Sequence, residues 1–163
     1  MNIRLRFAAI AVAAAIPLAL APAGMANAYD DHGYPGGGYE EVTGSEGCTP
    51  GYWKNHTDSW TVYSPSRPLS TVYAATPAVY SSTTLLQGLS FNGGNGVDGA
   101  SRILLRAAVA AILNAANEDV DYQYTSAQIT SQVNAALASG DRATILAVAS
   151  DLDRANNGGC TLN

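Results

Sequence analysis

The residues best suited to chemistry lie together in one short segment, 48–56, which reads Cys-Thr-Pro-Gly-Tyr-Trp-Lys-Asn-His. Trp60 follows four residues after this segment. On a helix, Trp53, His56 and Trp60 would share one face, because residues three and four apart are neighbours there. Such a face could stack on sugar rings, with flanking polar side chains supplying hydrogen bonds. The candidate ligand-binding residues are therefore Trp53, Lys54, Asn55, His56 and Trp60.

The same aromatic residues have a second interpretation, in which they belong to the hydrophobic core. Large aromatic side chains at helical spacing usually pack inward. We favour this interpretation for Trp53 first and then for Trp60, with His56 hydrogen-bonded beside the disulfide. The exposed platform remains the alternative, and the sequence does not say whether Trp60 is buried.

Metal and nucleophilic catalysis find little support in the sequence. The chain has only two histidines, whereas zinc sites use three or four His, Cys or carboxylate ligands. It contains no G-x-S-x-G motif and no cofactor-binding motif. We therefore expect no cofactor and no metal. A glycosidase acting through a carboxylate pair stays open as the alternative function, because a sequence does not report how far apart two carboxylates lie.

Two acidic sites could bind calcium weakly. Residues 93–98, the last of which is Asp98, match the first six positions of a calcium-binding nonapeptide repeat. Such sites are built from stacked repeats, and this sequence has one copy. Asp119 and Asp121 lack the glycine and the distal glutamate of a helix-loop-helix calcium site. For the first, the favoured interpretation is a flexible loop that ends at a helix start, with Asp98 near the positive helix terminus. For the second, it is a solvated acidic turn.

The beginning of the chain has the order of a secretory signal peptide. Arg4 and Arg6 precede an apolar run over residues 7–21, and Ala26 and Ala28 supply the small residues of a cleavage site. The run is shorter than the ~20 residues that span a bilayer. The sequence thus predicts a secreted, extracellular protein cleaved after Ala28 and not inserted in a membrane.

Residues 29–47 predict a disordered tail rich in Gly, Tyr and acidic residues, and residues 48–163 predict a single domain. Without the signal peptide the chain would hold six basic and thirteen acidic residues, a net charge of −7. This charge argues against nucleic acid as a partner. The expected partner is a cell-surface glycan or protein, and the sequence leaves the oligomeric state open.

Cys48 and Cys160, the only cysteines, bracket the predicted domain. Two cysteines in an exported protein usually pair. Closing a loop of ~100 residues would stabilise the fold by about 4–5 kcal/mol in the chain-entropy model. Two free thiols, or a bond between chains, are the alternatives.

Helical patterns dominate the predicted domain. A Thr-Pro pair at residues 49–50 predicts a short helix from Pro50 to about Trp60. Residues 61–84 are rich in Ser, Thr, Tyr and Pro and predict an extended loop that wraps the core, with room for short strands. A helical turn at residues 84–89 and a Gly-rich loop over 91–99 follow.

The clearest helix covers residues 100–116, where apolar residues leave only a thin polar edge of Arg102, Arg106 and Asn114. A helix this apolar is expected to be central and mostly buried. Thr125 with its capping-box partner three residues later predicts the start of the next helix, which Gly140 ends.

A final helix follows from Asp141 and stops before the glycines at 158–159. The predicted fold is all-α. It is a small bundle of four or five short helices with a Ser/Thr/Pro/Tyr-rich wrapping loop, closed by one disulfide between its ends.

From residue 48 onward the chain resembles a secreted bacterial domain of uncharacterised function. The motif C-T-P-G-Y-W-K-N-H and the C-terminal N-N-x-G-C carry this resemblance, together with the helical segments between them. The resemblance implies secretion and a compact domain, and it brings no catalytic residue or ligand. With the missing catalytic set, it favours a secreted non-enzymatic binding or structural module of the extracellular or cell-surface space.

Overall fold

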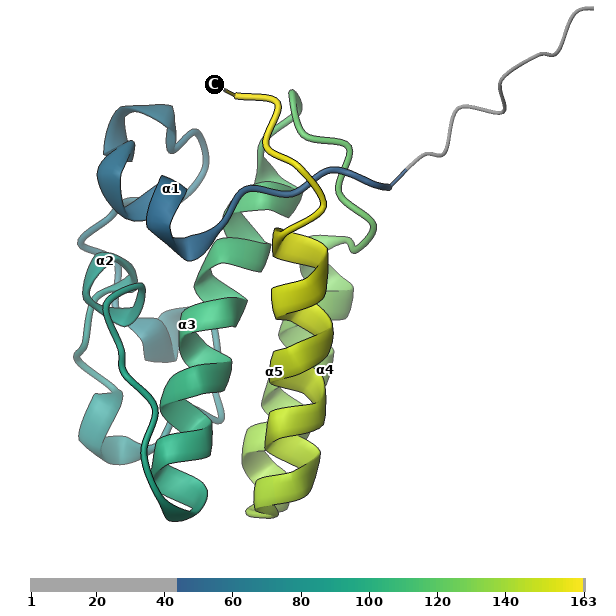
Figure 1. Cartoon of the computed structure of the whole chain (residues 1–163). Helices are drawn as coiled ribbons and strands as arrows, with labels where there is room; N and C mark the ends of the chain where they lie inside the picture. Colours follow the sequence, from purple (N-terminus) through teal and green to yellow (C-terminus); the bar gives the residue numbers. More distant parts are fainter. Residues whose placement is uncertain (1–43, 163) are drawn as a thin grey trace, which may run out of the picture. The chain divides into compact units, whose positions relative to one another are not determined.

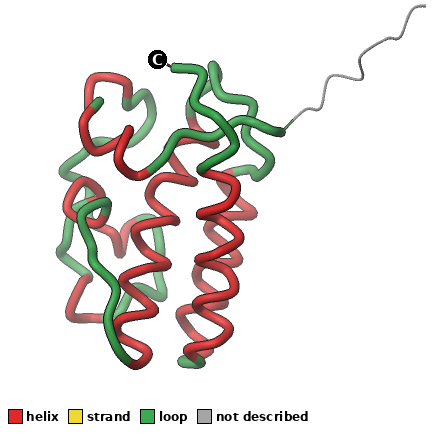
Figure 2. The backbone as a smooth tube through the Cα atoms, in the orientation of Figure 1, coloured by secondary structure: helices red, strands yellow, loops and turns green. Residues whose placement is uncertain are grey.

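A computed structural model of the chain describes residues 44–162. In chain order its helices are α1 (Pro50–Asn55), α2 (Leu85–Gly88), α3 (Gly96–Ala116), α4 (Ser126–Ser139) and α5 (Arg142–Asn156). Within these residues there are isolated β-bridges but no β-strand, so the predicted all-α class is confirmed (Figure 2). The predicted signal peptide and most of the predicted tail lie outside the described residues.

The centre of the domain is α3, which contacts each of the other four α-helices. Figure 1 shows α4 and α5 running alongside it, while α1 and α2 lie on its other side. Alanines 107, 108, 110 and 111 are buried along α3, and such small side chains let neighbouring helices approach closely. The prediction of a buried central helix is confirmed.

The start of α3 differs from the prediction, because the helix begins at Gly96 and not at residue 100. Glycine has a low helix propensity, which favoured a loop through Gly99. A Cβ atom at Gly99 would lie 2.1 Å from the carbonyl oxygen of Gly94, so only glycine lets the preceding loop pack on this turn. Arg142 of α5 donates to the Gly96 carbonyl at 2.5 Å and ties the same turn to α5.

The boundaries of α4 and α5 follow local signals and agree with the prediction. The Thr125 hydroxyl accepts the Gln128 N–H, and the Gln128 side chain accepts the Thr125 N–H in return. Gly140 ends α4 with a φ of 61°, a conformation that glycine adopts without strain. The Asp141 carboxylate then accepts the N–H of Thr144 and caps α5.

The first helix is shorter than predicted. It ends at Asn55, and a separate 3-10 turn follows at Thr57–Ser59. His56 leaves the helix with a ψ of 61°. Trp53, His56 and Trp60 therefore do not share the face of one continuous helix, and the predicted stripe is wrong in this respect.

The segment between α1 and α2 wraps the core as predicted, but with 3-10 turns at Leu69–Thr71 and Ala78–Tyr80 where short strands had been considered. Only an isolated bridge joins Pro68 to Thr84. Leu69 and Tyr73 anchor the loop, since both are fully buried. The Tyr73 hydroxyl donates to the Ala108 carbonyl of α3 at 2.7 Å.

The two ends of the domain are joined by the Cys48–Cys160 disulfide, with 4.4 Å between the Cα atoms. The predicted pairing is thereby confirmed. Backbone bridges from Ser45 to Tyr122 and from Gly47 to Gly159 lie beside it. Residues 44–47, which the sequence placed in the tail, thus pair with the folded domain.

Candidate functional site

A buried amide, Asn114, connects the disulfide to α1, α3 and α5. Its Oδ1 accepts the Cys48 N–H at 2.8 Å and the Trp53 Nε1–H at 3.0 Å. Its Nδ2 donates to the Cys48 carbonyl at 2.9 Å and to Asn156 Oδ1 at 3.0 Å. All four hydrogen-bonding positions of the amide are thereby used. The placement of Asn114 on the polar edge of the helix is wrong, because its side chain is fully buried.

This network also fixes Trp53 as part of the core. Trp53 is fully buried, as the core interpretation expected, and its indole N–H bonds to Asn114. Trp60 is half-buried, and its indole N–H donates to the Trp53 carbonyl at 3.0 Å. Trp53 is therefore not available for an open aromatic platform, whereas Trp60 keeps part of its ring exposed.

His56 lies away from the two tryptophans. Its ring stacks on Tyr52, with 4.1 Å between centroids and 12° between planes, and its Nδ1 lies 2.9 Å from the Tyr52 carbonyl. It is exposed and is not the buried histidine that the core interpretation had placed nearby. Asn55 is also exposed, and its amide donates to the Gly51 carbonyl at 2.9 Å.

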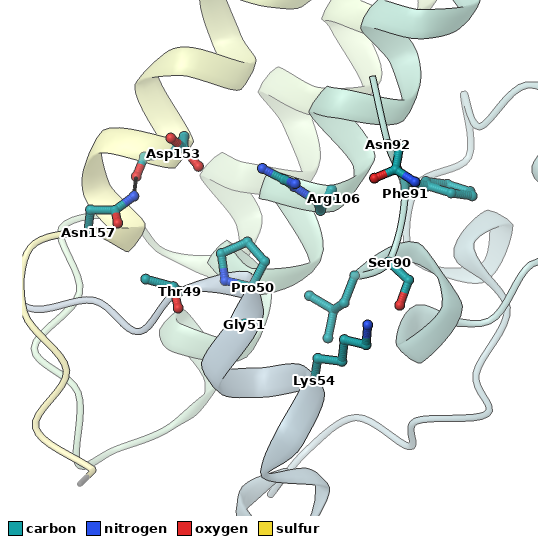
Figure 3. A pocket seen from close by; sticks show the side chains of 11 residues that line it. Thr49, Pro50, Gly51, Lys54, Ser90, Phe91, Asn92, Arg106, Asp153 and Asn157 are labelled. Carbon is teal, nitrogen blue, oxygen red and sulfur yellow. Dashed lines mark hydrogen bonds between the residues drawn. The ribbon is translucent and has the colours of Figure 1, made fainter. Parts of the chain in front are cut away.

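A polar cleft of about 470 Å³ lies between α1, α3, α5 and the loop after α2. Figure 3 shows Lys54 rising from α1 into it, and Arg106 reaching from α3 towards Asp153 on α5. The ring of Phe91 turns away from the cleft and lies 5.0 Å from that of Tyr80. The cleft is lined by Thr49, Pro50, Gly51, Lys54, Leu89, Ser90, Phe91, Asn92, Arg106, Asp153 and Asn157.

Local sequence positions the cationic groups of this cleft. The Thr49 hydroxyl caps α1 by accepting the Tyr52 N–H at 3.2 Å, and Lys54 follows in the last turn of that helix. Arg106 lies within α3, lines the cleft and is half-buried. The loop that carries Ser90 and Asn92 leads directly from α2 towards α3.

Lys54 and Arg106 differ from every other cation of the described residues, because they make no hydrogen bond or ion pair there. Arg102 pairs with Asp98 at 3.2 Å, and Arg154 pairs with Asp151. The other two cations are engaged differently: Arg142 donates to the Gly96 carbonyl, while Arg67 donates to the Thr71 hydroxyl and lies over the Tyr63 ring. The two unengaged cations line the same cleft.

Of the five predicted ligand-binding residues, Lys54 alone lines this cleft. Sequence reasoning missed Arg106, which it treated as part of a solvated polar edge, and it gave no role to Asp153. A cation in an otherwise apolar helix was the available signal for Arg106. No sequence signal joined it to Lys54, since the two residues lie on different helices.

Asp98 and Asp121, two of the acidic residues considered for calcium, are engaged with protein groups. Asp98 accepts the Tyr80 hydroxyl at 2.5 Å and pairs with Arg102. That hydrogen bond raises the pKa of Tyr80. The Asp121 carboxylate accepts the N–H of Gly44 at 2.7 Å. Within residues 44–162, no three His, Cys, Asp or Glu side chains gather so that they could hold a metal ion.

None of the described helices combines the length and the apolar character that crossing a bilayer requires. The disulfide indicates folding in an oxidising compartment, as extracellular proteins do.

Fold and cleft together define a small helical domain closed by one disulfide. The chain belongs to the family described as Protodermal factor 1 C-terminal domain, which matches residues 48–162. This range begins at Cys48 and includes Cys160, so the family unit coincides with the disulfide-closed part of the chain. No curated protein gives a significant match, and no solved structure does.

The family match corrects the resemblance drawn from the sequence. Both motifs that suggested a bacterial domain of uncharacterised function lie inside residues 48–162, and the family that matches there is a plant family. The assignment to a bacterial domain is therefore wrong. Short motifs around cysteines reflect the helix cap and the disulfide, which do not distinguish one source from another.

Proposed function

We propose that this chain is a secreted, non-enzymatic binding module of the extracellular or cell-surface space, and that its ligand occupies the cleft between α1, α3 and α5. The observation that carries the proposal is the pair of unengaged cations, Lys54 and Arg106, which line one open polar cleft. Charged side chains in a cleft are the groups that orient a bound ligand.

The scaffold around the cleft supports a binding role. Thr49 caps α1 and Lys54 lies on it, and the beginning of this helix is held by the Cys48–Cys160 disulfide and by Asn114. Arg106 belongs to the central helix, α3. Groups held by rigid elements lose little conformational entropy on binding, which favours affinity.

The alternative, a polysaccharide hydrolase, requires two carboxylates on either side of the scissile bond. Asp153 is the one carboxylate that lines this cleft. The cleft therefore favours binding, and an assay for reducing ends released from polysaccharides tests the alternative directly.

The proposal also includes the predicted export of the protein and the cleavage of its signal peptide. The disulfide fits export, and we propose that residues 1–28 act as a signal peptide that is removed after Ala28. Amino-terminal sequencing of the exported protein should begin at Tyr29. A mature protein that keeps Arg4 and Arg6 would contradict this part of the proposal.

The function is tested by probing the purified domain against an array of glycans, cell-wall polymers and surface proteins. We expect at least one ligand, with binding weakened in the double variant Lys54→Gln/Arg106→Gln. Arg67→Gln is the matched control, because that cation lies on the Tyr63 ring outside the cleft. An array without any ligand, or release of reducing ends, would overturn the proposal.

A further inference from the structure

We infer that the ligand of this cleft is a saccharide that carries carboxylates, of the uronic acid class, and that Lys54 and Arg106 bind its carboxylate. The inference rests on the proposed function, since it names the chemistry of the ligand in the same cleft. It is carried by the charges, by the neutral polar groups and by the orientation of Phe91.

The net charge of the cleft matches a ligand group that carries one negative charge. Lys54 and Arg106 bring two positive charges and Asp153 brings one negative charge, whereas the whole chain has a net charge of −5. The cleft is thus locally cationic on an acidic protein. A single excess positive charge matches a carboxylate, which carries one negative charge, better than a phosphate monoester, which carries close to two.

The neutral lining groups fit the hydroxyls of a sugar. The Thr49 hydroxyl accepts the Tyr52 N–H and so keeps its own O–H to donate. Asn157 donates through Nδ2 to the Asp153 carbonyl at 2.6 Å, which leaves its Oδ1 able to accept. Ser90 and Asn92 also line this cleft. Donors and acceptors therefore surround the cations.

The cleft is poorly suited to a neutral sugar or an acidic peptide. With Phe91 turned towards Tyr80, it has no aromatic face for stacking, so charge must supply much of the affinity. A peptide that is bound through more than its charges uses apolar pockets for its side chains or a strand edge for its backbone. The apolar lining includes Leu89, which is only 4% exposed, and the described residues contain no strand.

The test is calorimetric titration of the domain with an oligomer of galacturonic acid, with the matching neutral galactose oligomer and with a short polyglutamate peptide. We expect the acidic oligomer to bind and the neutral oligomer to bind at least about tenfold more weakly. Losing one charge-assisted hydrogen bond corresponds to about a ten- to hundredfold increase in Kd, which is the effect expected for Lys54→Gln and for Arg106→Gln.

Three controls separate this effect from unfolding and from general charge. Arg67→Gln should leave Kd within about twofold of the wild type, because the long-range effect of an exposed charge is screened by salt. Asp153→Asn should bind the acidic oligomer as tightly or more tightly, since it removes a repelling carboxylate. Each variant must keep the melting temperature of the wild type within a few degrees.

Equal affinity for both oligomers, preference for the peptide, or indifference to both cationic substitutions would overturn the inference. If another ligand from the array binds in the cleft, the proposed function stands while the uronic acid assignment fails. If nothing binds, both fail. Raising NaCl to about 1 M, where the Debye length is about 3 Å, should also weaken the expected complex.

Discussion

Replacing Asn114 with alanine removes the one side chain that joins the disulfide, Trp53 and α5 inside the core. Three buried groups would lose their partner: the N–H and the carbonyl of Cys48, and the indole N–H of Trp53. Asn156 Oδ1 would keep the hydrogen bond from Tyr122. The substitution therefore tests how much the buried polar network contributes to stability.

The magnitude follows from the number of groups left without a partner. A buried donor or acceptor without a hydrogen bond costs about 1–3 kcal/mol, so three such groups correspond to about 3–9 kcal/mol. A small domain has a total stability of about 5–15 kcal/mol. Asn114→Ala is thus expected to leave the domain marginally stable, with the disulfide as its main remaining constraint.

The measurement is urea unfolding of the oxidised protein, followed by tryptophan fluorescence. Asn134→Ala serves as the control, because Asn134 Oδ1 accepts a single hydrogen bond from the Ala75 N–H at 3.0 Å. That loss should cost about 1 kcal/mol. If Asn114→Ala costs no more than Asn134→Ala, the argument that this amide organises the core is refuted.

A charged variant at position 114 tests the burial of this side chain independently. Asn114→Asp places a carboxyl group in a fully buried site, where burial raises the pKa of a carboxylate. Because the folded-state pKa would lie above the unfolded one, the variant should gain stability relative to the wild type as the pH falls through that folded-state pKa. Stability that does not change with pH in this comparison would contradict the burial of the site.

Three further outcomes are expected. Reduction of the Cys48–Cys160 disulfide should lower the free energy of unfolding by about 4–5 kcal/mol, checked by unfolding with and without reductant. Gly99→Ala should lower the melting temperature strongly, because its Cβ would lie 2.1 Å from a loop carbonyl, whereas Gly51→Ala should not, since its nearest neighbour lies 3.6 Å away. Burial raises the pKa of Tyr122, so this hydroxyl contributes stability that is present below about pH 10 and lost as the pH rises through its folded-state pKa. Ultraviolet titration should therefore show its ionisation only at higher pH or with alkaline unfolding, and ionisation near pH 10 in the folded state would contradict this.

Local signals predicted the later helices well. Thr125 and Gly140 mark the ends of α4 through contacts with residues only a few positions away. The periodic apolar residues likewise indicated that α3 is central. These features could be read from the sequence because their causes lie within one or two helical turns.

The end of α1 and the beginning of α3 were harder to predict. Gly99 is helical because a loop carbonyl packs against the position where a side chain would lie, and propensity alone says the opposite. His56 leaves the helix and stacks on Tyr52, so the expected aromatic stripe is broken. At Gly99 the packing of the loop overrode the local preference, whereas His56 contacts a residue only four positions earlier.

The sequence by itself determined the helical class and indicated the pairing of Cys48 with Cys160, because helix periodicity and a single pair of cysteines are properties of the chain. Only the tertiary structure decided that Asn114 is buried and that Arg106 shares a cleft with Lys54. The physical reason is separation along the chain. Asn114 and Cys48 are 66 residues apart, so the hydrogen bonds that favour burial of the amide exist only after α1 and α3 have packed together.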